Sequence, residues 1–345
     1  MGNLQSYFLD FHDAIKLEID DNKALREKRE ELLEVLKENI DFEEGKYDIF
    51  HQGSYTMHTG VKPLEGGDYD IDVGLLFNIS TEDYPNPVTV KKLVYNAFKD
   101  NYEDTDMKYP CVTVKFEGEG NEEDLNYHVD FTIYSDENDD GQTYLAKGKL
   151  GSWSESRTWE HSDPKELVRT IKENLTDKED RKQFRRIIRY LKRWKDLKFK
   201  GVVNRPSGIG LTVAGLTQFH PHFSYSAFTK TYDDLDSLES FVQNMINSFS
   251  YRFNDDAELE ERLEVNLPTP PYNDIYEKMT GGQMKNFKSK LESLHDSLIE
   301  ARDETDPVKA CEILQKEFGE DFPVPTKKES AQQRGPAIMV DHSSA

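Results

Sequence analysis

The sequence has little cysteine, no long apolar run and a deficit of positive charge. Only two cysteines, Cys111 and Cys311, occur in 345 residues, which is too few for a four-cysteine zinc ribbon, and we expect both thiols to be reduced and buried. No apolar segment approaches the roughly 20 residues of a membrane-spanning helix, and no charged-then-apolar signal segment opens the chain. We therefore expect a cytoplasmic protein with no membrane partner.

Acidic residues far outnumber basic ones. The chain has 44 Lys and Arg against 67 Asp and Glu, for a formal charge of -23. Binding to a nucleic-acid backbone rests mainly on Lys and Arg, so this balance opposes a long nucleic acid as partner. An enzyme that acts on small anions fits better. The length allows one large domain or two smaller ones.

The stretch from residue 51 to residue 77 holds the most informative pattern. Acidic and apolar residues alternate from Tyr69 to Val73, so Asp70 and Asp72 leave the same face of a predicted strand. Two neighbouring carboxylates repel each other unless a cation neutralises them. Mg²⁺ commonly binds one or two carboxylates together with substrate phosphates. The pattern predicts a Mg²⁺ site, with a second ion to activate an attacking hydroxyl.

A third carboxylate and one spare accompany this pair. Residues 127–133 alternate in the same way and place Asp130 on the polar face of a second strand. We predict that Asp130 completes the metal site and acts as base or orienting group for the attacking hydroxyl. Asp68 shares the face of Asp70 but follows Gly66 and Gly67 at the mouth of the strand, so we assign it no ligand role.

Phosphate binding is expected from two other segments. Gly53 and Ser54 form a predicted tight turn at a helix start, where backbone N–H groups and a hydroxyl suit a triphosphate. Residues 178–199 form a predicted helix, and between residues 181 and 200 ten Lys or Arg face a single acid. Phosphates of a bound nucleotide explain this local reversal of charge, with Arg189 as one candidate; a solvated helix face is the alternative. Ser207 is either a phosphate ligand or only a helix N-cap.

The remaining periodicity gives the organisation of the chain. Residues 4–38 read as one or two helices that brace a sheet, and further helices are expected at 88–102, 233–250, 272–302 and 306–318. We predict an α/β protein of the α+β type: a mixed-sheet lobe at residues 1–162, a helical lobe at residues 163–325 and a flexible tail at residues 326–345. A nucleotide site is expected in the cleft between the lobes.

The motifs also carry a resemblance to a known family. A Gly-Ser turn, an Asp-x-Asp strand and a later single Asp resemble the polymerase β-type nucleotidyltransferases. The fuller segments QGSY, TGVKPL and DYDIDVG resemble the bacterial cGAS/DncV-like nucleotidyltransferases (CD-NTases), and WEHSDP, RYLKRW, PSGIGLT and FGEDFP agree with this. The resemblance implies a triphosphate contact from Lys192. The expected nucleotide-binding residues are Gln52, Gly53, Ser54, Tyr55, Lys192, Ser207 and Arg189; the expected catalytic and metal-binding residues are Asp70, Asp72 and Asp130.

The resemblance implies an enzyme of EC class 2.7.7 with two Mg²⁺ ions, for which Mn²⁺ can substitute. It would make a cyclic oligonucleotide second messenger, first of all a cyclic GMP-AMP, from ATP and GTP, and a separate effector would read the product in anti-phage (CBASS) signalling. In some relatives a ubiquitin-like conjugating enzyme acts on the C-terminus, which here is Ala345. The alternatives are a template-independent terminal transferase acting on RNA or a small acceptor, and a catalytically silent nucleotide sensor.

Overall fold

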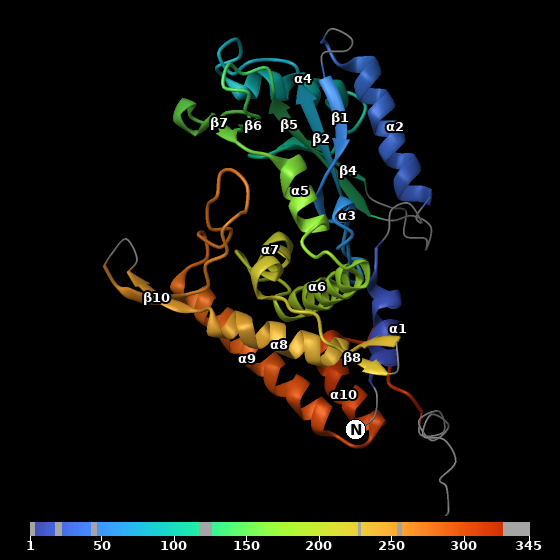
Figure 1. Ribbon diagram of the computed structural model, residues 1–345. Coiled ribbons are helices and arrows are strands. Elements are labelled where there is room, and N and C mark those ends of the chain that lie inside the picture. The colour runs from blue at the N-terminus through green and yellow to red at the C-terminus, as the bar shows by residue number, and fades with distance from the viewer. Residues whose placement is uncertain are drawn as a thin grey trace, which may run out of the picture.

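The computed structural model describes residues 4–17, 23–42, 47–116, 126–226, 229–253 and 257–326. Two lobes are stacked along the long axis of the molecule, with a mixed sheet and its helices at one end and a bundle of helices at the other (Figure 1). The predicted combination of a mixed-sheet lobe and a helical lobe is confirmed. The predicted tail lies almost wholly outside the described residues, and Ala345 with it.

Within the described ranges, the sheet lobe has seven strands in one mixed sheet. Along the main path the order is β1-β2-β5-β4-β3, with β6 on β5 and β7 on β6. The central pair β2 and β5 is parallel and the other pairs are antiparallel. The elements are α2 (Lys23–Asn39), β1 (Tyr47–His51), α3 (Gly53–Thr56), β2 (Tyr69–Phe77), α4 (Pro87–Lys99), β3 (Thr105–Met107), β4 (Val112–Phe116), β5 (Tyr127–Ser135), β6 (Tyr144–Lys147), the 3-10 turn η2 (Ser154–Ser156) and β7 (Thr158–His161).

The helical lobe is built around one long helix. That helix, α6, carries Tyr190 and Trp194, both fully buried. The elements of this lobe are α1 (Gln5–Ile15), α5 (Pro164–Lys172), α6 (Lys178–Lys198), α7 (Gly208–Gln218), the hairpin of β8 (Phe223–Ser226) and β9 (Thr229–Tyr232), α8 (Asp234–Asn247), the hairpin of β10 (Ser250–Phe253) and β11 (Leu259–Arg262), α9 (Gly281–Asp303) and α10 (Pro307–Phe318).

Short-range capping explains where several of these helices begin. The Asp163 side chain accepts a hydrogen bond from the backbone N–H of Glu166 at the start of α5, the first helix after the chain leaves the sheet lobe. Helix α9 starts with a capping box between Thr280 and Gln283. This box explains why the helix begins at residue 281 rather than at the expected residue 272. The two short hairpins of the helical lobe were not predicted.

The N-terminal helices differ from the sequence expectation. Helix α2 packs against α4 on the sheet lobe, as expected of a bracing helix. Helix α1 instead lies in the helical core, where the Phe8 and Phe11 rings contact Tyr190 with centroids 5.3 and 5.2 Å apart. The Tyr190 hydroxyl also donates a hydrogen bond to the Phe8 carbonyl, at 2.7 Å. The aromatic face of α1 therefore packs against α6 and α10, which are distant from it in the sequence.

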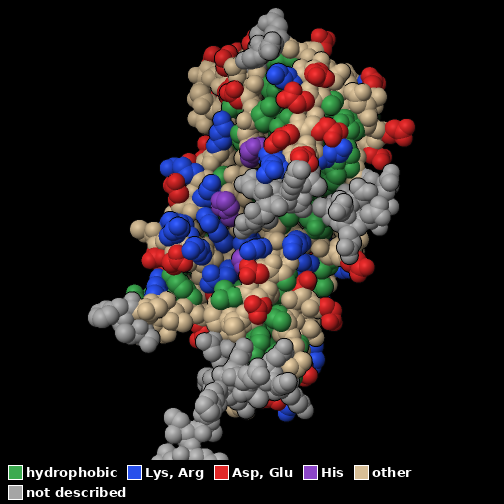
Figure 2. Space-filling view, turned by 90° about the vertical axis from the view of Figure 1, so that its right-hand side faces the viewer, with side chains coloured by type: hydrophobic (Ala, Val, Ile, Leu, Met, Phe, Trp, Pro, Cys, Tyr) green, Lys and Arg blue, Asp and Glu red, His purple; other side chains and the backbone are tan. Residues whose placement is uncertain are grey.

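Two expectations about composition can be compared with the structure. Cys111 and Cys311 are free and buried, as expected. Across the described ranges, no helix is both long enough and apolar enough to cross a membrane. Figure 2 shows that the negative charge is uneven: on the face drawn, Lys and Arg side chains gather at mid-height, where the lobes meet, while Asp and Glu are frequent on the upper lobe.

A buried lysine holds the edge of the sheet lobe together. Lys91 on α4 is fully buried, and its ammonium group donates to the carbonyl oxygens of Lys108, Tyr109 and Gly148 at 2.7, 2.9 and 2.6 Å. These contacts join α4 to the loops before β4 and after β6. Burial lowers the pKa of Lys91 to about 8.

We predict that Lys91→Met destabilises the protein by about 2–4 kcal/mol, because the methionine fills the space but leaves three carbonyl groups without their donor. Chemical denaturation followed by circular dichroism measures this loss. Lys92→Met, at an exposed position on the same helix, is the matched control and should change the free energy of unfolding by no more than about 0.5 kcal/mol. Equal effects of the two substitutions would contradict this account.

Candidate active site

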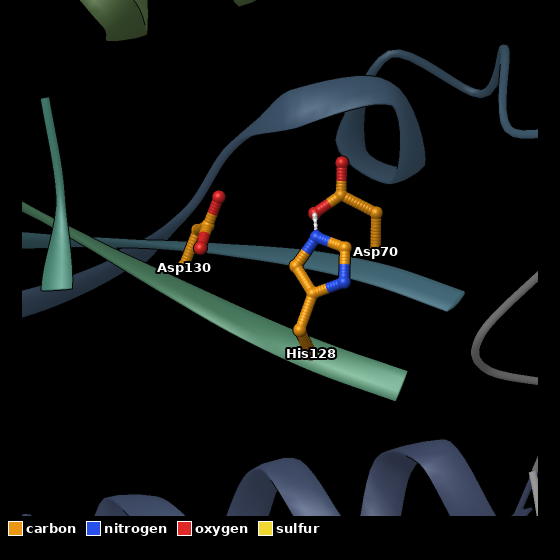
Figure 3. Close-up of side chains that lie close together, drawn as sticks. All are labelled: Asp70, His128 and Asp130. Atoms are coloured by element: carbon orange, nitrogen blue, oxygen red, sulfur yellow. Dashed lines mark ion pairs between the residues drawn. The ribbon is translucent and has the colours of Figure 1, made fainter. Parts of the chain in front are cut away.

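The register of β2 and β5 gathers four polar side chains on one face of the sheet. Asp70 lies opposite His128, and Asp72 lies opposite Asp130, on neighbouring parallel strands. Asp70 and Asp72 are two residues apart on β2, and His128 and Asp130 are two residues apart on β5. All four side chains therefore leave the same face of the sheet. Figure 3 shows three of them, Asp70, His128 and Asp130, rising together from the two strands. We call Asp70, Asp72, His128 and Asp130 the β2–β5 square.

Three members of the square place ligand atoms within reach of a single ion. Oxygen atoms of Asp70 and Asp130 and a nitrogen of His128 all lie within 4.8 Å of one another. The Asp70 Oδ1 and His128 Nε2 atoms are 3.2 Å apart, and this hydrogen bond is the main reason that the pKa of His128 is raised. Asp130 Oδ1 accepts a hydrogen bond of 2.5 Å from the Thr113 hydroxyl and lies 3.6 Å from Lys108 Nζ.

Asp72 is the deepest member of the square. Its carboxylate lies beneath the Gly-Ser turn, so closely that a Cβ atom on Gly53 would fall 1.8 Å from Asp72 Oδ2. Gly53 also has a φ of +74°, a conformation that favours glycine. Burial, followed by the charges of Asp70 and Asp130, raises the pKa of Asp72 to about 8. Carboxylates crowded in this way fit a divalent cation, which would offset their charge.

The Gly-Ser turn is tied to the sheet through its preceding residue. The Gln52 amide donates to Thr132 Oγ1 at 2.5 Å and accepts from the Tyr134 hydroxyl at 3.1 Å. Gln52 is therefore engaged within the sheet lobe, and it fixes where Gly53 and Ser54 lie above β2. Tyr55, the last residue of the QGSY motif, is partly buried and packs against the core of the sheet lobe.

Helix α6 of the other lobe brings a buried cation to the same place. The ammonium group of Lys192 donates to Thr59 O and Thr59 Oγ1 at 3.0 and 2.9 Å. Burial is the main cause that lowers the pKa of Lys192 to about 7, followed by the charges of Lys195 and Arg189. Gly208, at the start of α7, lies beside it: an added Cβ would fall 3.3 Å from Lys192 Cε. The lysine thus sits between the two lobes.

A cavity of about 980 Å³ opens between the lobes. Its polar end holds Asp70, Asp72 and His128 of the square together with the Gly-Ser turn, and its opposite wall comes from α6, the start of α7 and the segment 267–275. Most of the residues expected from the sequence line it: Gln52, Gly53, Ser54, Asp70, Asp72, Lys192 and Ser207. Ser207 also caps α7, because its hydroxyl accepts from the Gly210 N–H at 3.1 Å. The structure therefore assigns Ser207 its capping role, and phosphate binding stays a prediction.

Three expected site residues are not among the lining residues. Asp130 belongs to the square, and its Oδ1 accepts the hydrogen bond from the Thr113 hydroxyl. Tyr55 packs against the core of the sheet lobe. Arg189 is buried against α1 and the segment after α3: its Nε donates to Gly60 O at 3.0 Å, and its Nη1 is 2.8 Å from His12 Nε2. The basic residues of α6 thus form contacts between the lobes as well as lining the cavity.

Sequence reasoning missed His128. The signal was present, since His128 stands two residues before Asp130 in the same alternating strand and shares its face. Pairing of β2 with β5 could not be read from the sequence, however, and it is this pairing that brings His128 to Asp70. The cavity residues Lys195 and Lys200 were counted only as part of the basic stretch at residues 181–200, and Arg205 was not singled out; all three line the cavity.

The comparison with protein families places the site within a known domain. The family described as "Cyclic GMP-AMP synthase DncV-like, nucleotidyltransferase domain" matches residues 47–134, which include the Gly-Ser turn and the whole square. A cyclic GMP-AMP synthase of Escherichia albertii is 28% identical over 183 residues. That match covers 50% of this chain and only 37% of the relative.

Solved structures share the fold over most of the chain. The CD-NTase CdnG of Bradyrhizobium diazoefficiens, solved with GTP, has a TM-score of 0.66 at 13% identity, over 96% of this chain and 98% of that one. CdnC of E. coli, solved with ATP, has a TM-score of 0.63 at 17% identity, over 92% and 98%. The DncV cyclic AMP-GMP synthase of Vibrio cholerae, solved with a linear intermediate, has a TM-score of 0.57 at 21% identity, over 82% and 70%.

These findings agree with the motif resemblance over the same residues. The domain match covers the Gly-Ser turn, the Asp-x-Asp strand and the strand of Asp130, and the shared fold extends through the helical lobe. Residues 47–134 therefore match a DncV-like nucleotidyltransferase domain, and the chain as a whole is similar in fold to solved CD-NTases.

Proposed function

We propose that this protein joins nucleoside triphosphates into a cyclic oligonucleotide and releases pyrophosphate. One observation carries the proposal: the Asp70 and Asp72 carboxylates of the β2–β5 square and the buried ammonium group of Lys192 line one cavity between the lobes. The carboxylates suit divalent cations, and Lys192 suits the negative charge of a triphosphate. The cavity, at about 980 Å³, is at the upper end of the range for small-molecule sites, which leaves room for two nucleotides.

Each residue has a distinct part in the proposed reaction. The Gly53–Ser54 turn and Lys192 bind the donor triphosphate, with Ser207 at the start of α7 as a further contact. Asp70, Asp72 and Asp130 hold the cations, for which we propose two Mg²⁺ ions that Mn²⁺ can replace. When bound, the cations offset the phosphate charge and lower the pKa of the attacking ribose hydroxyl.

Asp130 orients the acceptor. The Thr113 hydroxyl donates to Asp130 Oδ1 and fixes the carboxylate, so that it can accept the proton of the attacking hydroxyl. The hydroxyl oxygen then forms a bond to the α-phosphorus as the bond to pyrophosphate breaks. A second transfer of the same kind closes the ring of the linear product.

The relatives supply the finer assignments. The V. cholerae neighbour was solved with the linear intermediate pppA(3′,5′)pG, and the other neighbours with GTP or ATP. We therefore propose ATP and GTP as substrates and a cyclic GMP-AMP as the first product to seek, read by a separate effector in CBASS signalling. E. coli CdnC was also solved in complex with HORMA-deltaN, and we propose a protein partner for this chain as well. The motif resemblance adds a ubiquitin-like conjugating enzyme acting on Ala345 to this proposal.

The direct test is to incubate the purified full chain with all four nucleoside triphosphates and Mg²⁺ or Mn²⁺, treat with phosphatase and identify products by mass spectrometry. We expect a phosphatase-resistant product with the mass of a cyclic di- or trinucleotide. Asp72→Asn should lower its yield on the order of 100-fold or more, because the cation loses a ligand.

Asp106→Asn is the matched control for this test. Asp106 is an exposed carboxylate on β3 of the same sheet and is not among the cavity residues, so its substitution should leave the yield unchanged. Linear or acceptor-attached products alone would support a terminal transferase instead. An unchanged yield from Asp72→Asn would refute the site assignment.

The pKa of Asp72 gives a prediction about stability. Folding raises this pKa from about 3.9 to about 8, so the folded protein binds more protons than the unfolded chain between these values. The free energy of unfolding of cation-free protein should therefore fall as the pH rises from about 4 to about 8. Asp72→Asn removes this term, and at pH 8.5 the cation-free variant should melt roughly 2–5 °C above the wild type.

Differential scanning fluorimetry with EDTA and then with Mn²⁺ measures both effects. Mn²⁺ should raise the melting temperature of the wild type at pH 8.5 by more than it raises that of Asp72→Asn. Asp106→Asn should behave as the wild type does. Parallel pH profiles for the wild type and Asp72→Asn would show that Asp72 carries no such penalty.

A further inference from the structure

The proposed reaction makes no use of His128, although its imidazole occupies a corner of the β2–β5 square. Its Nε2 lies 3.2 Å from Asp70 Oδ1. Its Nδ1 is buried without a hydrogen-bond partner among the described residues, and the nearest charge is Asp68 Oδ2 at 3.8 Å. A half-buried imidazole between two carboxylates can either form hydrogen bonds to them or bind a metal ion together with them.

The spacing of the atoms fits a shared ion. Two neighbouring ligands of an octahedral ion with bonds of about 2.1 Å lie about 3.0 Å apart, and opposite ligands lie about 4.2 Å apart. The Asp70 Oδ1 and His128 Nε2 atoms are 3.2 Å apart, and the ligand atoms of Asp70, His128 and Asp130 all lie within 4.8 Å of one another. An ion can therefore bind between β2 and β5 with only small side-chain adjustments.

The surroundings of the other ring nitrogen agree with a ligand role. A histidine that binds a metal through one nitrogen usually donates the other N–H to a carboxylate, carbonyl or water. His128 Nδ1 faces the Asp68 carboxylate, which follows Gly66 and Gly67. Gly66 has a positive φ and open space around its Cα. Asp68, to which the sequence analysis assigned no role, is thus placed to interact with the Nδ1 side of the His128 ring, opposite the proposed metal-binding nitrogen.

A nitrogen ligand changes which ion the site prefers. Mg²⁺ takes oxygen ligands and binds imidazole poorly, whereas Mn²⁺ and the later divalent transition metals accept carboxylate and imidazole together. We propose that His128 is a nitrogen ligand of one cation of the site, and that it makes this site favour Mn²⁺ over Mg²⁺. The inference rests on the proposed function, since it concerns the same cations.

Pulsed EPR detects such a ligand directly. Untagged full-length protein labelled with ¹⁵N-histidine is loaded with one equivalent of Mn²⁺, and the ¹⁵N hyperfine coupling to the ion is recorded. We expect one coupled histidine nitrogen in the wild type and none in His128→Gln, whose amide can keep the hydrogen bond to Asp70. His220→Gln, at an exposed position outside the cavity, is the matched control and should keep the coupling.

Affinities measured on the same proteins give a second readout. The EPR signal of free Mn²⁺ reports its Kd, and competition reports that of Mg²⁺. His128→Gln should weaken Mn²⁺ binding about tenfold or more and Mg²⁺ binding less than about threefold. A purely structural role for His128 would move both affinities together.

The outcomes separate this inference from the proposed function. Bound Mn²⁺ without ¹⁵N coupling overturns the ligand role of His128, and continued cyclic product formation by the same preparation would leave the proposed function standing. Failure of the wild type to bind Mn²⁺ overturns the inference as well. If that preparation also makes no nucleotide product with Mg²⁺, the proposed function fails together with it.

Discussion

The repulsion among three carboxylates at the centre of the sheet is the constraint on which the rest of the site depends. Asp70, Asp72 and Asp130 are brought together by the pairing of β2 with β5, and burial raises the pKa of Asp72 far above its usual range. Such an arrangement weakens a folded protein in the absence of a compensating charge. Its presence here supports the proposed cation site, at which a bound ion would supply the compensating charge.

The two lobes meet through contacts that also shape the cavity. Lys192 and Arg189 on α6 donate to Thr59 and Gly60, the segment that follows the Gly-Ser turn. The helical lobe therefore fixes the position of a turn that belongs to the sheet lobe. Further along α6, Arg186 forms a buried ion pair with Asp234 of α8, which keeps the helix in place. The proposed nucleotide site and the packing of the lobes are therefore linked through one helix.

The sequence predicted those parts of the fold and site that depend on local pattern. Alternation identified Asp70, Asp72 and Asp130, and the Gly-Ser turn was recognisable because few residues tolerate its backbone. What required the structure was long-range pairing. His128 becomes part of the site only because β5 lies parallel to β2 in this register, and Arg189 points toward α1 because α1 packs in the helical lobe. The short hairpins have too few residues to give a clear periodic signal.

The central claim is that cations held by the square face a triphosphate held by Lys192 and the Gly-Ser turn. The most direct measurement is a crystal structure with Mn²⁺ and a non-hydrolysable nucleoside triphosphate, with anomalous data at the manganese edge. We predict a manganese peak within about 2.5 Å of carboxylate oxygens of Asp70 and Asp72, with the triphosphate between Ser54 and Lys192. A manganese peak outside the square, or a triphosphate bound elsewhere, would contradict the account.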